Sequence, residues 1–228
     1  MPVHDESVLD NPVWFALTGP QAPFAVRRGS AVRFDPAVSP FVGIADDDEA
    51  SWDDLAELLG SSGPAAMFRS ARVPRGWVET FSARGLQMLA ETVERVSDPE
   101  IVKLGPNDAG EMFELAARTR PGPFEARTHE FGGYLGVRRE GALVAMAGER
   151  LHPPGWAEIS AVCTDKAVRG QGLASRLVRA VASAISARGD RPMLHVATSN
   201  TAAIALYERL GFRTRCEVGF AAYLWQPS

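Results

Sequence analysis

The clearest alternation of hydrophobic and polar positions lies in the second half of the chain. Apolar stretches follow one another over residues 132–139, 142–150 and 156–164, separated by short turns rich in glycine and proline. Runs of this length between turn residues predict β-strands, and such short connections favour antiparallel neighbours. We therefore expect an antiparallel meander, preceded by a strand at 101–104 and a helix over 111–118.

Helical spacing replaces this pattern after the meander. One face of a predicted helix that runs to about Arg188 carries Ala174, Leu177, Val178, Val181 and Ile185. A buried strand is predicted at 193–197, followed by a helix that ends before Gly211. Two strands, at about 212–218 and 220–225, are expected to close the fold.

The first half of the chain is less regular. Its first 40 residues are broken into short pieces by Pro12, Pro20, Pro23, Pro36 and Pro40. Short strands are predicted at 41–44, 65–70 and 85–91, with a helix over 52–59. No chemical motif is visible in this half.

Composition places the chain among ordinary globular proteins. Its 228 residues allow one large domain or two small ones, and no apolar run is long enough to predict a membrane span. The N-terminus carries acids and no apolar core, so we expect no secretory signal. The only cysteines, Cys163 and Cys216, cannot form a disulfide framework or a zinc quartet, which favours a cytoplasmic location and no structural metal.

Charge divides the chain into two parts. Residues 1–97 hold 8 Arg and no Lys against 14 Asp and Glu, a balance of −6, whereas residues 98–228 have a balance of +2. A net charge of −4 argues against a nucleic-acid partner, but the second part suits one anionic small ligand. We expect an N-terminal accessory domain over 1–97 and a ligand-binding domain over 98–228.

The loop after the third meander strand is the most informative motif. It reads Arg169-Gly170-Gln171-Gly172-Leu173-Ala174 and leads into a helix. The two glycines allow close backbone approach, and the first amides of the helix have no internal partner. Together with the helix dipole and Arg169, they predict a pyrophosphate cradle.

Two common phosphate-binding motifs do not fit this loop. The dinucleotide fingerprint needs a third glycine and a position early in a βαβ unit, and neither is present. The Gly-Lys-Ser/Thr of a P-loop is absent as well. A glycine-rich turn without a ligand is the simpler alternative.

The segment 156–213 resembles the acyl-CoA-binding core of the GCN5-related N-acetyltransferase (GNAT) superfamily. Arg169-x-x-Gly172-x-Ala174 is similar to one family signature, and Asn200-x-x-Ala203-x-x-Leu206-Tyr207-x-x-x-Gly211-Phe212 is similar to a second. The order of predicted elements from 101 to 225 also resembles the family, most closely its FR47-like branch. The resemblance implies an α/β (α+β) fold: a mixed, mostly antiparallel sheet flanked by helices, joined to an N-terminal α/β region.

The resemblance further implies how acetyl-CoA binds. The third meander strand and strand 193–197 would splay apart, and the pantetheine arm would pair with backbone groups of Val162, Cys163 and Thr164. The N–H of Val162 or Cys163 would face the thioester oxygen. The pyrophosphate would be held by the segment Arg169, Gly170, Gln171, Gly172, Leu173, Ala174 and Ser175. Asn200 would contact pantetheine, cap its helix, or do both.

The catalytic assignments also follow from the resemblance. Tyr207 is the candidate general acid for the departing thiolate, its alternative role being to pack the helix on the sheet. Glu158 is the candidate general base, and strand periodicity would place it on one face with Ser160, Val162 and Thr164. An exposed structural carboxylate is the alternative, and Glu149 is a rival base.

Other reactive side chains favour structural roles. Cys163 could carry an acyl group, but its neighbours indicate a buried apolar thiol. His195, in the middle of a predicted strand, suits a core or cleft-lining position. His129 and His152 lack partners at metal-ligand spacing.

The loop 119–130 falls where the family builds its acceptor pocket. Phe124, Arg127 and His129 are the candidates there, together with Glu149, although the loop also suits a solvated connector.

These patterns predict an N-acetyltransferase that uses acetyl-CoA and a small-molecule or peptide amine, by direct attack in a ternary complex. The alternative is a non-catalytic acyl-CoA-binding or sensing protein, with the same groove but no need for Glu158 and Tyr207. Residues 1–97 could also be a degenerate copy of the same fold. The sequence leaves the acceptor and the oligomeric state open, a homodimer being one option.

Overall fold

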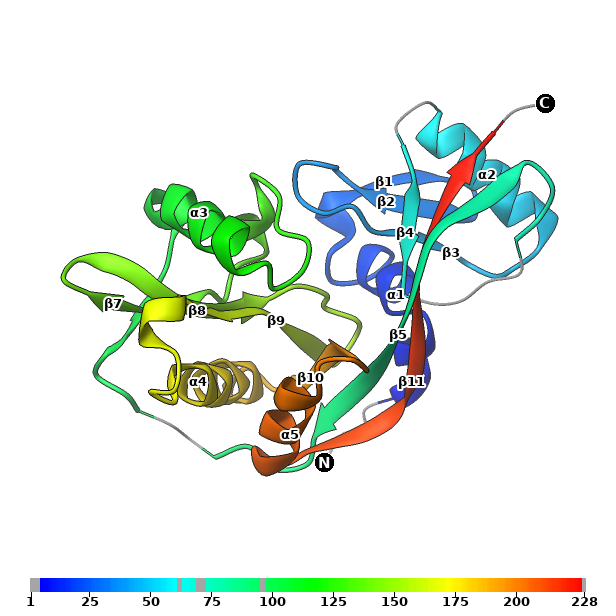
Figure 1. Cartoon of the computed structure of the whole chain (residues 1–228). Coiled ribbons are helices and arrows are strands. Elements are labelled where there is room, and N and C mark those ends of the chain that lie inside the picture. Colours follow the sequence, from blue (N-terminus) through cyan, green and yellow to red (C-terminus); the bar gives the residue numbers. More distant parts are fainter. Residues whose placement is uncertain (1–4, 61–62, 69–72, 95–96, 227–228) are drawn as a thin grey trace.

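A mixed eight-stranded sheet forms the centre of the molecule (Figure 1). The computed structural model describes residues 5–60, 63–68, 73–94 and 97–226. Its strands are β4 (Ala65–Met67), β5 (Trp77–Ala90), β6 (Ile101–Lys103), β7 (Leu135–Arg139), β8 (Ala142–Glu149), β9 (Trp156–Thr164), β10 (Arg191–Ala197) and β11 (Phe212–Trp225). Their spatial order is β4-β11-β5-β10-β9-β8-β7-β6. Among the strand ladders of the described residues, only that between β9 and β10 is parallel. The expected mixed, mostly antiparallel sheet and its meander of β7, β8 and β9 are therefore confirmed.

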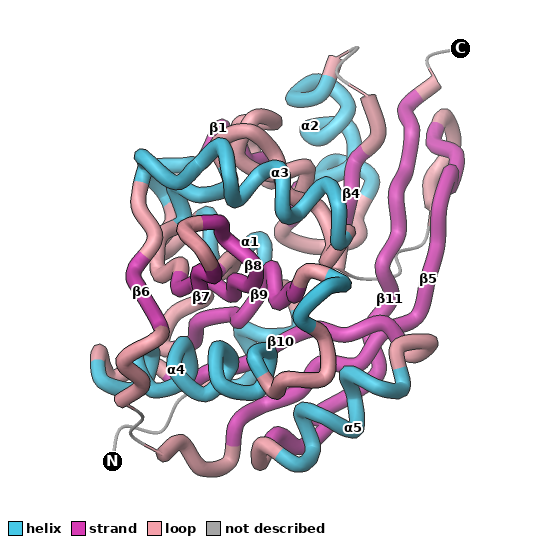
Figure 2. The backbone as a smooth tube through the Cα atoms, turned by 60° about the vertical axis from the view of Figure 1, so that its left-hand side comes forward, coloured by secondary structure: helices cyan, strands magenta, loops and turns pink. Residues whose placement is uncertain are grey.

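The closing segment is one strand and not two. β11 pairs with β5 from Phe212 opposite Ala90 to Trp225 opposite Trp77. Gly219, which separated the two expected strands, lies opposite Arg84 within this ladder. Two register shifts let the long pair twist without a break, and Figure 2 shows the two strands running side by side along one edge of the molecule.

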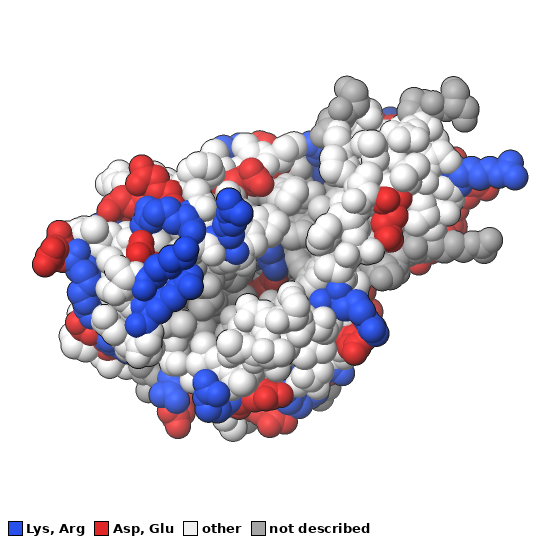
Figure 3. All heavy atoms as spheres, viewed as in Figure 1, with Lys and Arg blue, Asp and Glu red and all other residues white. Residues whose placement is uncertain are grey.

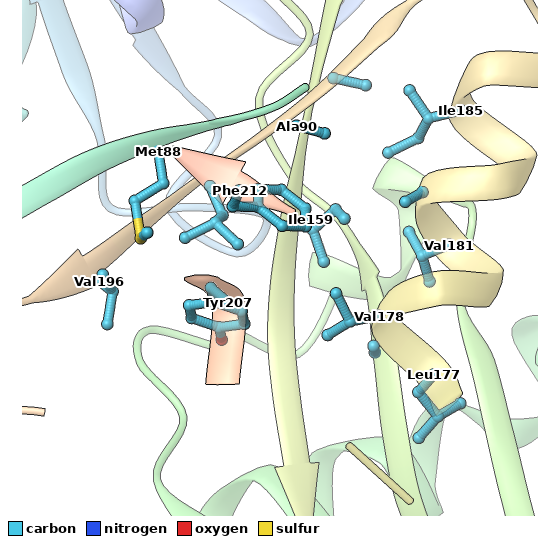
Figure 4. Packing of buried hydrophobic residues seen from close by; sticks show 14 of the residues in the cluster. Met88, Ala90, Ile159, Leu177, Val178, Val181, Ile185, Val196, Tyr207 and Phe212 are labelled. Carbon is cyan, nitrogen blue, oxygen red and sulfur yellow. The ribbon is translucent and has the colours of Figure 1, made fainter. Parts of the chain in front are cut away.

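Helices cover both faces of the meander. α3 (Ala109–Thr119) packs on one face of β8 and β9, and α4 (Leu173–Ala187) packs on the other. Four of the five residues on the predicted apolar face of α4 are fully buried against the sheet, namely Leu177, Val178, Val181 and Ile185 (Figure 4). The fifth, Ala174, is only partly buried. Burial of each such side chain contributes about 1.5–3 kcal/mol. α5 (Thr201–Arg209) follows β10 and contacts β11.

The N-terminal part adds a second, three-stranded antiparallel sheet. It consists of β1 (Ala25–Arg28), β2 (Ala31–Phe34) and β3 (Val42–Ile44), with α1 (Pro12–Leu17) and α2 (Glu49–Leu59) packed beside it. Of the three short strands predicted in this half, 41–44 corresponds to β3 and 65–70 to β4, although residues 69 and 70 lie outside the described part. The third, 85–91, belongs to the much longer β5.

The eight-stranded sheet crosses the expected boundary at residue 97. β4 and β5 come from the first half of the sequence, yet β11 from the second half pairs with both. Polar contacts also join the halves, since Arg215 pairs with Asp10 and the Trp156 indole donates to the carbonyl of Asp5. The charge division therefore does not mark a division of the sheet. In the described stretches, no helix is both long and apolar enough to span a bilayer.

Candidate active site

β9 and β10 part shortly after they begin to pair. Their parallel ladder runs only from Trp156 opposite Arg191 to Glu158 opposite Met193. Beyond this point β10 stays with β5 while β9 stays with β8. The predicted splay is present, and it opens a wedge between the C-terminal ends of the two strands.

A β-bulge in β9 shapes one wall of this wedge. Met146 lies opposite Cys163 but Gly148 lies opposite Ser160, so β9 has one residue more than β8 over this stretch. Ala161 there has a φ of +53°, a conformation that costs a non-glycine residue about 1–3 kcal/mol and concentrates at functional sites.

The bulge corrects the prediction that Glu158 shares a strand face with Val162 and Thr164. Ile159 and Val162 both pack on the α4 side, three residues apart, whereas Ala161 and Cys163 pack on the α3 side. The extra residue reverses the alternation, and Glu158 therefore lies on the face opposite to Val162.

A groove of about 470 Å³ follows the parted strands, and we call it the β9–β10 groove. Its walls come from the end of α3, from β9, from the loop and first turn of α4, and from α5. They comprise Thr119, Arg120, Pro121, Val162, Cys163, Thr164, Val168, Arg169, Gly170, Gly172, Leu173, Ala174, Ser175, Asn200, Ala202, Ala203 and Leu206. Ten of the twelve residues predicted to bind the cofactor thus line one groove. The two that do not line it are Gln171 and Tyr207.

The glycine loop presents backbone to this groove. Gly170 and Gly172 have φ values of +81° and +75°, a region that favours glycine, and Gly172 is the N-cap of α4. A Cβ on either glycine would meet no atom within 4 Å and would instead project into open space. Arg169 beside them donates from Nε to the carbonyl of Thr164 at 3.3 Å. Amides, helix dipole and guanidinium therefore converge on a site suited to an anion.

Two polar side chains complete the groove. Thr164 Oγ1 is buried and has no hydrogen-bond partner among the described residues. Because an unsatisfied buried hydroxyl is costly, a ligand with polar groups along its length would relieve it. Asn200 caps α5, its Oδ1 accepting from the amide of Ala203 at 3.2 Å, so the capping role predicted for it is present.

Comparisons with known proteins agree with this geometry. A family model described as FR47-like protein matches residues 134–221. The chain is 41% identical over 83 residues to the N-alpha-acetyltransferase RimI of Mycobacterium tuberculosis, and 44% over 87 residues to the mycothiol acetyltransferase of Salinispora tropica. These matches cover 35% and 36% of the chain but 51% and 28% of the two relatives, so the chain spans about half of their length or less.

A solved structure extends the likeness to the whole chain. A Novosphingobium aromaticivorans protein, assigned to the acetyltransferases of the GNAT family, is 42% identical with a TM-score of 0.89, covering 96% of this chain and 99% of that one. The chain belongs to the GNAT family. Acetyl-CoA is the acetyl donor that the family implies, and the β9–β10 groove fits it: the glycine cradle suits its pyrophosphate, and the unpartnered Thr164 hydroxyl suits its amide-bearing arm.

Tyr207, the predicted acid of this GNAT protein, lies in the core beside the groove. Its ring packs near Phe212 with centroids 6.0 Å apart, and in Figure 4 its hydroxyl points away from that ring. Burial raises the pKa of Tyr207 to about 12. The hydroxyl therefore keeps its proton throughout the neutral range, as a proton donor must.

Glu158, the predicted base, is fully buried in a polar network. Its carboxylate accepts from Arg150 Nε and Nη2 at 2.9 and 2.5 Å, and its Oε1 lies 2.7 Å from His195 Nδ1. Burial alone would raise the pKa of Glu158, but Arg150 and His195 outweigh it and lower the pKa to about 2. Both oxygens are already occupied, and the carboxylate is a weak base.

The network continues from His195 to the N-terminal part. Gln87 Oε1 accepts from Arg215 at 3.0 Å, so its Nε2 is the donor, both to the carbonyl of Leu9 at 2.9 Å and to His195 Nε2 at 3.1 Å. His195 Nε2 is then the acceptor, and its Nδ1 carries the proton that is donated to Glu158. Both ring nitrogens of His195 are therefore partnered.

A second cavity of about 420 Å³ shares Pro121 with the groove; we call it the apolar pocket. Its lining is Phe41, Ala66, Met67, Phe68, Phe81, Ala83, Pro121, Gly122, Pro123, Arg150, His195, Ala197, Phe220, Ala221 and Ala222. The Arg150 guanidinium stacks on the rings of Phe41 and Phe68 at 5.0 and 4.8 Å, and His195 stacks on Phe68 at 4.6 Å. His195 thus has the cleft-lining place considered for it.

The predicted acceptor residues have other contacts. Phe124 packs edge to face on Tyr134, Arg127 pairs with Asp35 and Glu130, and Glu149 pairs with Arg188 and His152. His129 Nδ1 is buried without a partner among the described residues. The described linings of the groove and of the apolar pocket contain none of these four residues.

Sequence reasoning missed the residues that join the two cavities. Thr119, Arg120 and Pro121 line the groove, and Pro121 also lines the apolar pocket. The Arg-Pro-Gly-Pro sequence at 120–123 was visible as a rigid loop at the right place, but nothing in it showed which side chains face inward. The aromatic residues of the first half carried no such signal at all.

Proposed function

We propose that the protein transfers an acetyl group from acetyl-CoA, bound in the β9–β10 groove, to an amine bound beside it in a ternary complex. The observation that carries the proposal is the meeting of two different cavities at segment 119–123, where β9 and β10 part. One cavity suits a long anionic donor and the other suits a second, smaller molecule.

The groove residues bind and orient the donor, which supplies a thioester as the source of the acetyl group. The amides after Gly170 and Gly172, with Arg169, hold the pyrophosphate. Backbone groups of residues 162–164 pair with the pantetheine arm. An N–H of Val162 or Cys163 donates to the carbonyl oxygen as negative charge develops, an interaction worth about 3–4 kcal/mol in comparable sites.

Tyr207 moves the proton in this scheme. Its hydroxyl proton passes to the departing sulfur, and the proton that the attacking nitrogen loses restores the hydroxyl. No separate base is needed when the amine arrives uncharged, because a neutral primary amine brings the required proton itself. Protons therefore balance through Tyr207 alone.

Glu158 acts in this scheme as a positioning residue and not as the predicted general base. Its pKa of about 2 lies far below the usual value near 10 for an amine. Direct proton uptake from an ammonium ion would be uphill by roughly 8 pKa units, or about 11 kcal/mol. Because this scheme assigns no general base on the enzyme, we expect kcat/KM to rise with pH up to the pKa of the acceptor amine.

The test is transfer by the purified protein from acetyl-CoA to pooled primary amines, with thiol release and product mass as readouts. We expect amine-dependent thiol release and acetylated amine. Tight binding of acetyl-CoA with no transfer to any amine would contradict the proposal and favour the acyl-CoA-sensing alternative.

A further inference from the structure

We propose that the apolar pocket binds the acceptor, and that this acceptor is an amine with an aromatic or branched aliphatic skeleton and no second positive charge. The inference rests on the proposed acetyl transfer and adds the class of substrate to it.

The pocket is built mainly from large apolar side chains of the first half of the chain and of β11. Its walls include Phe41, Met67, Phe68, Phe81 and Phe220. Aromatic walls of this kind favour flat or branched apolar groups, and about 420 Å³ lies at the small end of ligand pockets. The cavity therefore suits one ring or branched chain and not an extended saccharide.

The position of the pocket suits an acceptor. β10 contributes His195 and Ala197 to the pocket, while β9 contributes Val162 and Cys163 to the groove. These strands part only after Glu158 and Met193, so the two cavities flank the same opening. Figure 3 shows a hollow on this face of the molecule, with Lys and Arg side chains gathered to its left.

The electrostatics of the pocket exclude a second cation. Among the described residues that line the pocket, Arg150 is the one Lys, Arg, Asp or Glu. The buried carboxylate of Glu158 neutralises its charge through two hydrogen bonds. No carboxylate is found among the described lining residues. A polyamine or a lysine derivative would bring a further ammonium group into an apolar cavity without a partner, which is costly. An amine with an apolar body avoids this cost.

Phe81 and Val78 provide a matched pair of variants. Both are exposed residues of β5, at 57% and 44%, so an aspartate at either position should leave folding intact, but only Phe81 lines the pocket. Phe81→Asp would remove an aromatic wall and add the missing carboxylate. Val78→Asp adds the same charge outside the pocket.

The experiment compares kcat/KM for phenethylamine, phenylalanine amide and a tripeptide amide that begins with phenylalanine against spermidine and lysine amide. We expect at least a tenfold preference for the phenyl-bearing amines, and the tripeptide shows whether peptides enter as well as small molecules. Phe81→Asp should reduce this preference at least tenfold and Val78→Asp should not. A preference for spermidine or lysine amide, or equal effects of both variants, would overturn the inference.

A second readout separates this inference from the proposed function. Calorimetric binding of phenethylamine and spermidine to the acetyl-CoA-saturated protein requires no turnover. If no amine is acetylated but phenethylamine binds selectively and Phe81→Asp abolishes this binding, acetyl transfer fails and the pocket assignment stands. If amines are acetylated without this selectivity, the pocket assignment fails alone.

Discussion

The β9–β10 groove and the apolar pocket are neighbours of similar size, yet they are built in different ways. The groove depends on backbone: positive φ at Gly170 and Gly172, amides at the start of α4, and the free edge of β9. The pocket depends on side chains from at least five separate segments, with a buried ion pair as its floor.

This difference separates recognition of the donor from recognition of the acceptor. A backbone site needs few particular residues, and these lie close together in the sequence. A side-chain site can change its specificity by single substitutions while the groove stays intact. Variants of each site should therefore affect one cavity and spare the other, and the following predictions test that separation in order of decreasing effect.

The largest effect is expected on the free energy of unfolding, from Glu158→Gln, because Glu158 is the buried partner of the pocket residue Arg150. Glutamine keeps the shape but leaves Arg150 buried without a counter-charge, which costs about 3–5 kcal/mol of stability. The pKa of Glu158 falls from 4.5 to about 2 on folding, so its contribution is present above pH 4.5 and is lost as pH drops towards 2. The free energy of unfolding, measured with denaturant between pH 7 and pH 3, should fall with pH in the native protein. In the variant it should depend less on pH. Equal stability of the two proteins at pH 7 would contradict the account.

Tyr207→Phe should be the next most damaging change, and it should affect the rate only. The ring still packs beside Phe212, but the proton donor is gone, so we expect kcat to fall about a hundredfold. The affinity for acetyl-CoA, measured by calorimetry, should stay within about twofold. Unchanged turnover would remove Tyr207 as the acid.

Arg169→Ala should weaken acetyl-CoA binding only about fivefold, because an exposed charge contributes about 1 kcal/mol at most and the amides remain. The difference from the native protein should shrink at high salt. Arg179→Ala, an exposed arginine on α4 away from the groove lining, is the control and should change nothing. A hundredfold or greater loss of acetyl-CoA binding would instead show that the groove depends on side chains.

The smallest effect is expected from Cys163→Ala. Burial raises the pKa of the Cys163 thiol to about 11, so almost none of it is thiolate at neutral pH. Turnover should stay within about twofold, and intact-protein mass measured during turnover should reveal no acetylated form. An acetylated intermediate that disappears in the variant would instead establish a covalent route.

The same contrast explains how far the sequence could predict the molecule. The meander, α4 and the glycine loop are local patterns, and their predicted positions hold within a few residues. The bulge at Ala161 was not predictable from alternation, and it moved Glu158 to the other face. The Arg150–Glu158–His195 network spans 45 positions of the sequence, and the walls of the pocket run from Phe41 to Ala222. Contacts between such distant residues leave no periodic trace. The individual residues of 1–97 that line the pocket were not predicted for this reason, and neither was the full extent of β5.

The account depends most directly on the glycine cradle as the site of acetyl-CoA. Gly172 and Gly189, at the two ends of α4, both have positive φ and both have open space where a Cβ would point. Calorimetric titration should give one acetyl-CoA site in the native protein and in Gly189→Glu, with at least hundredfold weaker binding to Gly172→Glu. Equal affinity of all three proteins would contradict the assignment of the groove.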